Sequence, residues 1–144
     1  FLLSLKIKRK QIISLVIFGL ILILVTDQLT NLFKVQVGRL RPCFDSQLKD
    51  MVRLVKSSCG GKFSFFSGHA SNSFALAFFF GKVVKRHFKM VNVILIFIAG
   101  LISYSRIYIG VHYPLDIICG MVVGTIIGIV FYRIWEKTKY SHEY

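Results

Sequence analysis

Acidic residues and cysteines are scarce in this sequence of 144 residues, and both shortages limit the classes of function that it can have. Only six aspartate and glutamate residues accompany 19 lysines and arginines, which gives a net charge of +13. The three cysteines have no histidine or cysteine partners at ligand spacing, so no zinc site is indicated. Internal repeats, low-complexity tracts and linkers are also missing from the sequence. We therefore expect a single domain.

Apolar residues make up 55% of the chain, and the mean hydropathy of +0.66 is high for a soluble globule. The four apolar stretches are residues 11–33, 71–84, 90–108 and 114–135. A helix that spans a bilayer needs about 20 mostly apolar residues, a length that the first, third and fourth stretches reach. The second is marginal and is expected to span only together with the residues that precede it from Ser67. The sequence thus predicts an all-α, polytopic transmembrane helix bundle with four spans.

A net charge of +13 is also typical of proteins that bind nucleic acid. Here, however, the basic residues form three clusters: before the first apolar stretch, between the second and third, and after the fourth. If four spans alternate, all three clusters lie on one side of the membrane, which is the positive-inside pattern. We therefore expect a bilayer, and no nucleic acid, as partner. The clusters are Lys6, Lys8, Arg9 and Lys10; Lys82, Lys85, Arg86 and Lys89; and Arg133, Lys137 and Lys139, with His87 and His142 solvated on the same side.

The same topology places a long loop, from about residue 34 to 67, on the outer face. Pro42 disfavours a helical extension of the first span, and residues 60 and 61, both glycine, indicate a turn. Apolar spacing within residues 46–57 favours a short amphipathic helix at the interface. Cys43 and Cys59 flank that segment in an oxidising compartment, so we expect either a disulfide or two free thiols, and favour the disulfide. Cys119, inside the fourth span, is expected to act as a small apolar residue.

The stretch "SRIYIGVHYPLD" places ionisable side chains at the outer turn between the third and fourth spans. Gly110 supplies the turn, and Pro114 suits the first position of the following helix. Taken alone, Asp116 is a favourable acid at a helix N-terminus, and His112 is an interfacial histidine. Taken together, the carboxylate can accept the Nδ1 proton of the histidine and leave Nε2 with a lone pair. This pair predicts a histidine nucleophile.

Cations from three segments accompany this pair on the outer face, namely Lys34, Arg41 and Arg106. Arginine binds phosphate bidentately through its planar fork, so a phosphate is the expected target. "FSGH" adds Ser67, Gly68 and His69 at the start of the second span, where a helix N-terminus offers backbone donors to an anion. Ser67 also suits the role of a helix N-cap.

Three motifs in this order resemble the signature of the type 2 phosphatidic acid phosphatase (PAP2) superfamily. They are Lys34 followed after six residues by Arg41-Pro42; Ser67-Gly68-His69; and Ser105-Arg106 followed after five residues by His112 and after three more by Asp116. The resemblance covers most of the chain, from the first apolar stretch to the fourth. Phe66 stands where the family usually has a proline before Ser-Gly-His.

The resemblance implies both a fold and a site. Members usually have six transmembrane helices with this signature on helices three to six, so residues 1–144 would be the C-terminal part of such a domain, with N-terminal helices missing. His112 would form a phosphohistidine, Asp116 would orient it, and His69 would act as general acid. The phosphoryl oxygens would be held by Lys34, Arg41 and Arg106 and by the amides of Ser67 and Gly68. The resemblance implies no metal ion and no other cofactor.

The implied function is metal-independent hydrolysis of a lipid phosphate or pyrophosphate at the outer face of a bacterial inner membrane. Undecaprenyl pyrophosphate is the favoured substrate, and phosphatidylglycerol phosphate and lipid A phosphates are the alternatives. A lipid phosphotransferase would use the same pocket, with a lipid acceptor in place of water. A non-catalytic scaffold or transporter is disfavoured because every ligand of the signature is present.

Asp27 lies outside the signature, in the outer part of the first span. On a helix it shares a face with Asn31 and Lys34. A carboxylate inside a membrane needs a partner. We expect Asp27 either to brace Lys34 or an arginine of the site, or to accept a hydrogen bond from a neighbouring helix.

Overall fold

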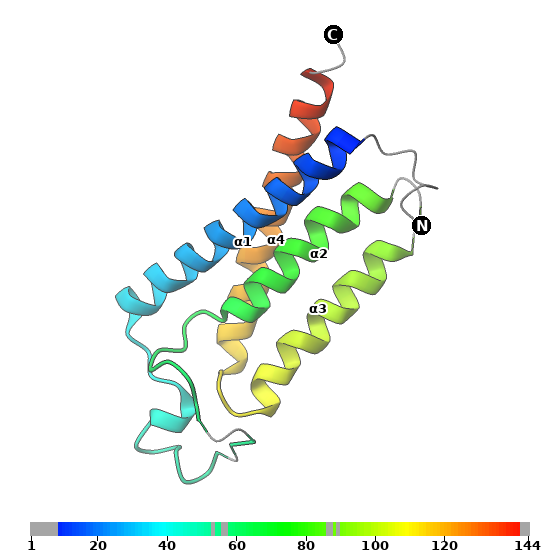
Figure 1. The fold of residues 1–144 in the computed structure, drawn as a ribbon. Helices are drawn as coiled ribbons and strands as arrows, with labels where there is room; N and C mark the ends of the chain where they lie inside the picture. Colours follow the sequence, from blue (N-terminus) through cyan, green and yellow to red (C-terminus); the bar gives the residue numbers. More distant parts are fainter. Residues whose placement is uncertain (1–8, 53, 56–57, 86–87, 89, 142–144) are drawn as a thin grey trace.

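The computed structural model describes residues 9–52, 54–55, 58–85, 88 and 90–141, and the statements below refer to these residues. The chain forms four long helices, with a long loop (residues 38–67) that contains a short 3-10 helix, η2 (Pro42–Phe44) (Figure 1). The helices are α1 (Arg9–Val37), α2 (Gly68–Lys85), α3 (Val91–Tyr108) and α4 (Pro114–Ser141). The predicted all-α fold is confirmed. Within the described residues, extended segments pair only at an isolated bridge between Leu40 and Phe63.

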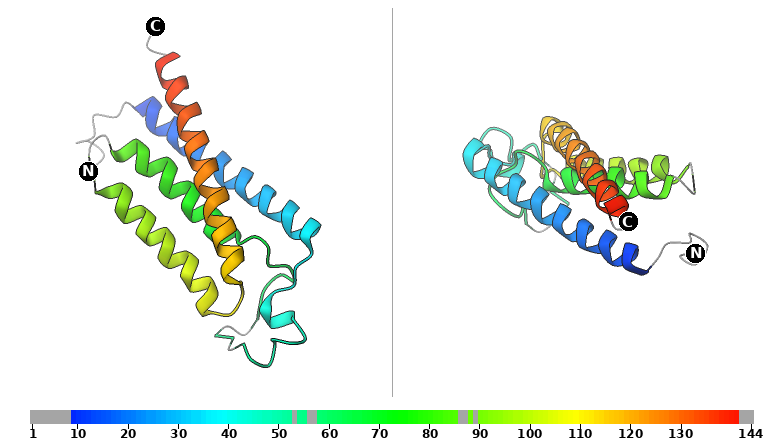
Figure 2. Two further views of the ribbon diagram at one scale, coloured as in Figure 1. Left: turned by 180° about the vertical axis from the view of Figure 1, so that it is seen from behind. Right: turned by 90° about the horizontal axis from the view of Figure 1, so that it is seen from above.

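The central helix of the bundle is α2, which packs against α1, α3 and α4, and most extensively against α4 (Figure 2). Its Phe79 is fully buried in a cluster with Leu15 and Leu22 of α1 and Trp135 of α4. On its other side, a second cluster formed by Phe74, Ala77 and Ala99 joins α2 to α3. The apolar core therefore lies on both sides of α2.

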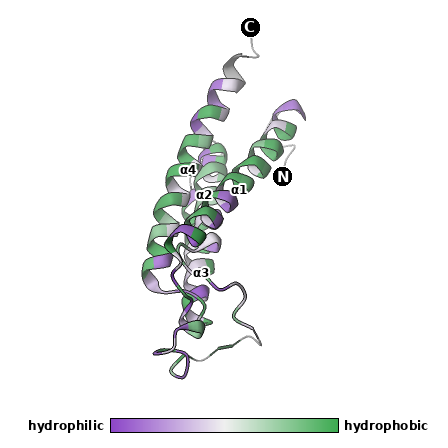
Figure 3. Ribbon diagram, turned by 90° about the vertical axis from the view of Figure 1, so that its left-hand side faces the viewer, coloured by the Kyte–Doolittle hydropathy of each residue, from purple (hydrophilic) through white to green (hydrophobic). Residues whose placement is uncertain are grey.

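Three of the helices, α1, α3 and α4, are long and apolar enough to cross a membrane. Their outward faces keep large apolar side chains exposed, for example Leu20 at 64% and Phe97 at 66%. Hydrophobic residues recur along the length of these helices (Figure 3). A bilayer solvates such faces, whereas water does not. The marginal hydropathy of α2 has a physical reason, because this helix is enclosed by the other three and needs little contact with lipid.

The bundle has a basic end and, opposite it, an end that carries the long loop (Figure 1). Arg9 and Lys10 begin α1, and α2 ends at Lys85, so these charges lie at the basic end with the C-terminal part of α4. Several of the predicted inner residues lie outside the described residues, namely Lys6, Lys8, Arg86, His87, Lys89 and His142. At the opposite end, α1 stops before Pro42, because Gly38 adopts a positive φ of 63° and its N–H bonds the carbonyl of Lys34.

A row of glycines on α4 allows α2 to approach it at backbone distance. The row comprises Gly120, Gly124 and Gly128, spaced four residues apart on one helix face. A Cβ atom added at Gly120 would lie 2.6 Å from the carbonyl oxygen of Ser67, and at Gly124 it would collide with the backbone of Ser71. Small residues at this spacing are a recurrent means of helix packing in membranes.

Gly124→Ala is therefore expected to destabilise the bundle by about 1–3 kcal/mol, because the added methyl group overpacks the contact with α2. Thermal unfolding in detergent should show a lower midpoint. Gly100→Ala is the matched control, because a Cβ at this α3 position would meet nothing within 4 Å. Equal midpoints for the two variants would contradict the role of the glycine row.

Candidate active site at the loop end of the bundle

A single carboxylate, that of Asp116, joins a helix cap to a histidine. Asp116 lies in the first turn of α4 and is 0% exposed. Its Oδ2 accepts the backbone N–H of Tyr113 at 2.9 Å, which caps the first turn. The same oxygen lies 3.4 Å from Nδ1 of the buried His112. Because Nδ1 faces a carboxylate, we assign the proton to Nδ1 and the lone pair to Nε2.

The surroundings of His112 keep its ring neutral. Burial lowers the pKa of His112 from its ordinary value of 6.5, and the hydrogen bond with Asp116 opposes this effect. The positive charges of Arg41 and Lys34 lower the pKa further. Near pH 7 the Nε2 atom is therefore available as a nucleophile. The two cations, Lys34 and Arg41, come from the last turn of α1 and from the long loop, at the same end of the bundle as His112.

The N-terminus of α2 meets the first turn of α4. Ser67 is buried and caps α2, because its hydroxyl accepts the N–H of Ala70 at 3.4 Å. Its own N–H donates to the carbonyl of Asp116 at 3.0 Å, so this amide, expected on a phosphate oxygen, is engaged by the protein itself. Gly68 begins α2, and its N–H has no acceptor inside the helix. His69 follows it and is exposed at the same helix end.

Two of the predicted cations lie at helix C-termini. Lys34 is in the last turn of α1 and Arg106 in the last turn of α3, and both are half-buried. The Nε of Arg106 donates to the hydroxyl of Ser105 at 3.2 Å. Helix C-termini stabilise positive charge, so the backbone favours both cations at this end of the bundle.

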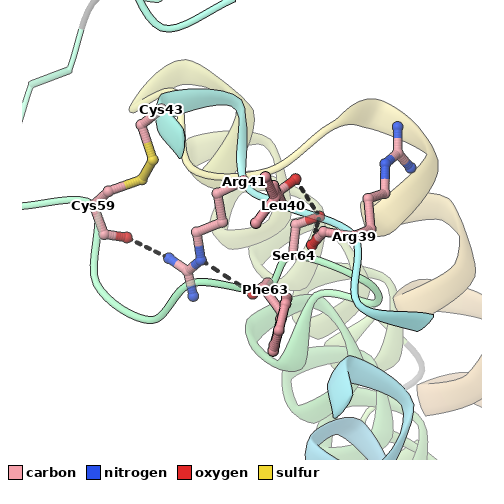
Figure 4. Close-up of a disulfide and its surroundings, with 7 residues drawn as sticks. All are labelled: Arg39, Leu40, Arg41, Cys43, Cys59, Phe63 and Ser64. Carbon is pink, nitrogen blue, oxygen red and sulfur yellow. Dashed lines mark hydrogen bonds between the residues drawn. A yellow bond between two sulfur atoms is a disulfide. The ribbon is translucent and has the colours of Figure 1, made fainter. Parts of the chain in front are cut away.

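The third cation, Arg41, comes from the long loop and directs its guanidinium at two loop carbonyls (Figure 4). Its Nη1 donates to the carbonyl of Cys59 at 2.6 Å, and its Nε donates to that of Phe63 at 3.3 Å. A guanidinium has five N–H donors, and these bonds use only two of them. The remaining donors on Nη1 and Nη2 form an edge that suits bidentate contact with phosphate. Arg41 can thus fix the loop and still bind an anion.

Cys43 and Cys59 form a disulfide, with their Cα atoms 6.4 Å apart (Figure 4). The favoured alternative from the sequence is therefore the one present. The disulfide holds the Cys59 carbonyl where Arg41 binds it. Cys119 is a free, half-buried cysteine in α4.

In the described part of residues 46–57 the predicted amphipathic helix is not formed, and residues 46–51 make consecutive turns instead. Asp45 organises these turns, because its carbonyl accepts the N–H groups of Leu48 and Lys49 at 3.1 and 2.9 Å. Its side chain also accepts the N–H of Gln47 at 2.9 Å, a local bond that begins the first turn at Asp45. Residues 53, 56 and 57 lie outside the described residues.

A cleft of about 350 Å³ opens beside His112, between the long loop and the turn from α3 to α4. This volume is within the range of small-molecule sites. Apart from His112 and two tyrosines, its walls are apolar. They consist of Pro42, Leu48, Val52, Ile107, Tyr108, Gly110, His112, Tyr113 and Pro114.

Arg39 belongs to the site although the sequence analysis does not single it out. Its Nη1 lies 3.2 Å from Oδ1 of Asp116, and its guanidinium carbon lies 4.0 Å from the centre of the Tyr113 ring. The Tyr113 hydroxyl in turn donates to Oδ2 of Asp45 at 3.2 Å. A second arginine in "GRLRP" was the available signal, but a sequence does not reveal which of two arginines faces a buried carboxylate.

Asp27 forms the interhelical hydrogen bond that was one of its two predicted alternatives. Its Oδ1 accepts a hydrogen bond from Nδ2 of Asn72 on α2 at 2.7 Å. Asn72 also bonds the hydroxyl of Thr26. Among the described residues, Asp27 forms no ion pair with Lys34, so its evident role is to join α1 to α2.

The chain is similar to known proteins over most of its length. Residues 14–140 match the family model of the PAP2 superfamily. The chain is 38% identical over 125 residues to a lipid A 4'-phosphatase of Porphyromonas gingivalis, which covers 85% of this chain and 52% of the relative. It is 35% identical over 131 residues to phosphatidylglycerophosphatase B of Bacillus subtilis, which covers 84% of this chain and 60% of the relative.

A crystal structure of a transmembrane PAP2 type phosphatidylglycerolphosphate phosphatase from Bacillus subtilis has the same fold, with a TM-score of 0.70 and 28% identity. The match covers 84% of this chain and 59% of that one. This chain thus spans about half to three-fifths of the length of these proteins. With its apolar helices, the likeness identifies a multi-pass membrane protein.

Proposed function

The chain belongs to the PAP2 superfamily, and on this premise we propose that it hydrolyses a lipid phosphate through a phosphohistidine. The observation that carries the proposal is the buried pair of His112 and Asp116, 3.4 Å apart, with Nε2 left as the nucleophilic atom. Neutral His112 is ready to attack, and Asp116 stabilises the positive charge that the ring gains.

In the proposed reaction, Nε2 of His112 attacks phosphorus, and the bond between phosphorus and the lipid oxygen breaks. His69 donates a proton to the departing oxygen. A water molecule then attacks the phosphohistidine, gives a proton to His69 and releases inorganic phosphate. Both histidines return to their starting states.

The phosphoryl oxygens are held in this proposal by Lys34, Arg41, Arg106 and the N–H of Gly68. These cations neutralise the charge that a metal ion neutralises in many other phosphatases. Ser67 contributes indirectly, because it caps α2 and binds the backbone of Asp116.

The apolar walls of the cleft support a lipid as the carrier of the phosphate. Relatives that cover most of this chain are named lipid A 4'-phosphatase and phosphatidylglycerophosphatase B. These names favour lipid A phosphate or phosphatidylglycerol phosphate over undecaprenyl pyrophosphate, the substrate favoured by the sequence analysis. They also favour hydrolysis over transfer to a lipid acceptor, because a phosphatase releases inorganic phosphate.

We place the protein in a bacterial inner membrane with the site outside, since the basic end of the bundle should face the cytoplasm. In a Cys119→Ser background, Lys49→Cys in the long loop should react with an impermeant thiol reagent in intact cells. Lys85→Cys at the end of α2 should react only after the cells are permeabilised. The reverse labelling pattern would place the site in the cytoplasm.

The mechanism predicts that His112→Ala abolishes turnover and that Asp116→Asn lowers kcat by roughly 10³- to 10⁴-fold, by analogy with tautomer loss in triads. Plotted against pH, kcat/KM should be bell-shaped, because one histidine must be neutral and the other protonated. The pKa of His112 is lowered from its ordinary value of 6.5, so the midpoint of the acidic limb should lie below pH 6.5. Along this limb, activity is lost as His112 gains its proton.

Acid quenching of the enzyme with ³²P-labelled substrate should trap acid-labile label on His112. Chelators should leave the rate unchanged. Substantial turnover by His112→Ala, or a strict requirement for an added divalent metal, would refute the mechanism.

The cleft predicts how the lipid is bound. Leu48→Asn should raise KM for the preferred lipid phosphate roughly ten-fold, which corresponds to about 1.4 kcal/mol of lost apolar burial. Hydrolysis of p-nitrophenyl phosphate, which lacks a lipid, should be unaffected. Met51→Asn is the matched control, because Met51 belongs to the same turns but is 80% exposed. Assays on the three candidate lipids identify the preferred one, and an equal change in KM for both variants would argue against the cleft.

A further inference from the structure

The buried carboxylate of Asp116 has a cationic partner in addition to His112. Its Oδ2 serves His112 and the N–H of Tyr113, whereas its Oδ1 lies 3.2 Å from Nη1 of Arg39. Asp116 is 0% exposed, so water does not solvate its negative charge. A buried carboxylate is costly unless it is paired and hydrogen-bonded, and Arg39 provides the pairing on the oxygen that His112 leaves open.

Arg39 is itself held at both its backbone and its side chain. Its carbonyl accepts the N–H of Ser64 at 2.8 Å and the Ser64 hydroxyl at 3.3 Å (Figure 4). Its guanidinium lies over the Tyr113 ring at 4.0 Å, a cation–π contact, and the Tyr113 hydroxyl is tied to Asp45. Figure 4 shows the Arg39 side chain leaving the loop in a different direction from that of Arg41. The two arginines therefore have different partners.

We propose that Arg39 is a positioning residue for the reaction, which fixes the Asp116 carboxylate with Oδ2 toward His112 and balances its charge so that His112 stays neutral. Arg39 acts through Asp116 and not on the phosphate. The kinetic part of this proposal rests on the proposed function. The structural part rests on the contacts of Arg39 alone.

The charged and titratable groups around the pair set the sign of the effect. Lys34 from α1 and Arg41 from the loop lower the pKa of His112, whereas Asp116 raises it. Tyr113, with its partner Asp45, lies beside the carboxylate. His69 in the first turn of α2 and Arg106 in the last turn of α3 lie at the same end of the bundle. Without Arg39, the whole charge of Asp116 would act on His112 and favour its protonated form. His112 would then keep its proton to higher pH, although Lys34 and Arg41 limit the change.

Arg39→Gln is therefore expected to lower kcat roughly 10- to 100-fold, the usual cost of losing a group that orients a functional side chain. The acidic limb of its pH profile should move to higher pH. Arg39→Lys should recover part of kcat and restore the position of the limb, because lysine keeps the charge but not the planar fork. Lys62→Gln removes a charge from the same loop without touching Asp116, and it should behave as the wild type.

A double-mutant cycle with Asp116→Asn tests whether Arg39 acts through the carboxylate. In that background Arg39→Gln should change kcat by less than roughly three-fold, since the charge that it balances is gone. The same cycle can be measured as midpoints of thermal unfolding, which requires no enzymatic activity. Arg39→Gln should lower the midpoint of thermal unfolding when Asp116 is present and should not lower it in the Asp116→Asn background.

An unchanged pH profile in Arg39→Gln, an equal shift in Lys62→Gln, or additive effects in the cycle would overturn the proposal. If the wild-type protein did not release phosphate from any ester tested, the proposed function would be refuted. The midpoints of thermal unfolding would then test the structural part of the proposal alone. Coupled effects of the two substitutions would support the role of Arg39 on Asp116, and additive effects would refute it.

Discussion

The close approach of α4 to α2 is the constraint on which the site depends. Lipid provides no hydrophobic force between apolar helices, so their association relies on packing and on interhelical hydrogen bonds. The glycine row of α4 supplies the packing, and Gly120 lies against the carbonyl of Ser67, where the signature segment of α2 begins. The same contact brings the N–H of Ser67 to the carbonyl of Asp116 at 3.0 Å. Two motifs distant in sequence thus become one site because glycine stands where any side chain would separate them.

Asp116 combines structural and chemical roles that cannot be separated. A carboxylate in the first turn that accepts the N–H of the residue before the helix is an ordinary capping arrangement. It also pairs with His112, which lies four positions earlier, and both side chains are buried, which is the basis of the proposed reactivity. In water the attraction between an acid and a histidine is weak, and burial strengthens it while raising the cost of leaving the charge unpaired. The site therefore needs a full set of partners around this carboxylate.

Much of the fold was predictable because its signals are local. Apolar stretches fixed the helices to within a few residues, Gly110 and Pro114 marked the turn before α4, and the cysteine pair indicated the disulfide. The His112–Asp116 pair was predictable for the same reason, since only three residues separate its members.

The failures of prediction are a local set of turns and two contacts between segments. Apolar spacing in residues 46–57 favoured a helix, but the bonds made by Asp45 produced turns. The amide of Ser67 has the position of an anion donor, yet α4 occupies it. Arg39 could not be distinguished from Arg41 because the two differ only in which way the loop turns each side chain, and the partners of both lie far away in sequence.

The scarcity of acids in the sequence has a physical counterpart at the site. In the described part of the chain, Asp116 forms an ion pair with Arg39, and the neutral ring of His112 hydrogen-bonds the same carboxylate. The cations of the signature, Lys34, Arg41 and Arg106, form no such ion pair there. Like charges gathered beside an apolar membrane repel one another and are poorly solvated, and a phosphate that brings negative charge offsets both costs. A site with few acids is thus suited to an anion. In the role proposed for it, Arg39 shields the buried carboxylate of Asp116 so that this carboxylate serves the histidine instead of neutralising the cations.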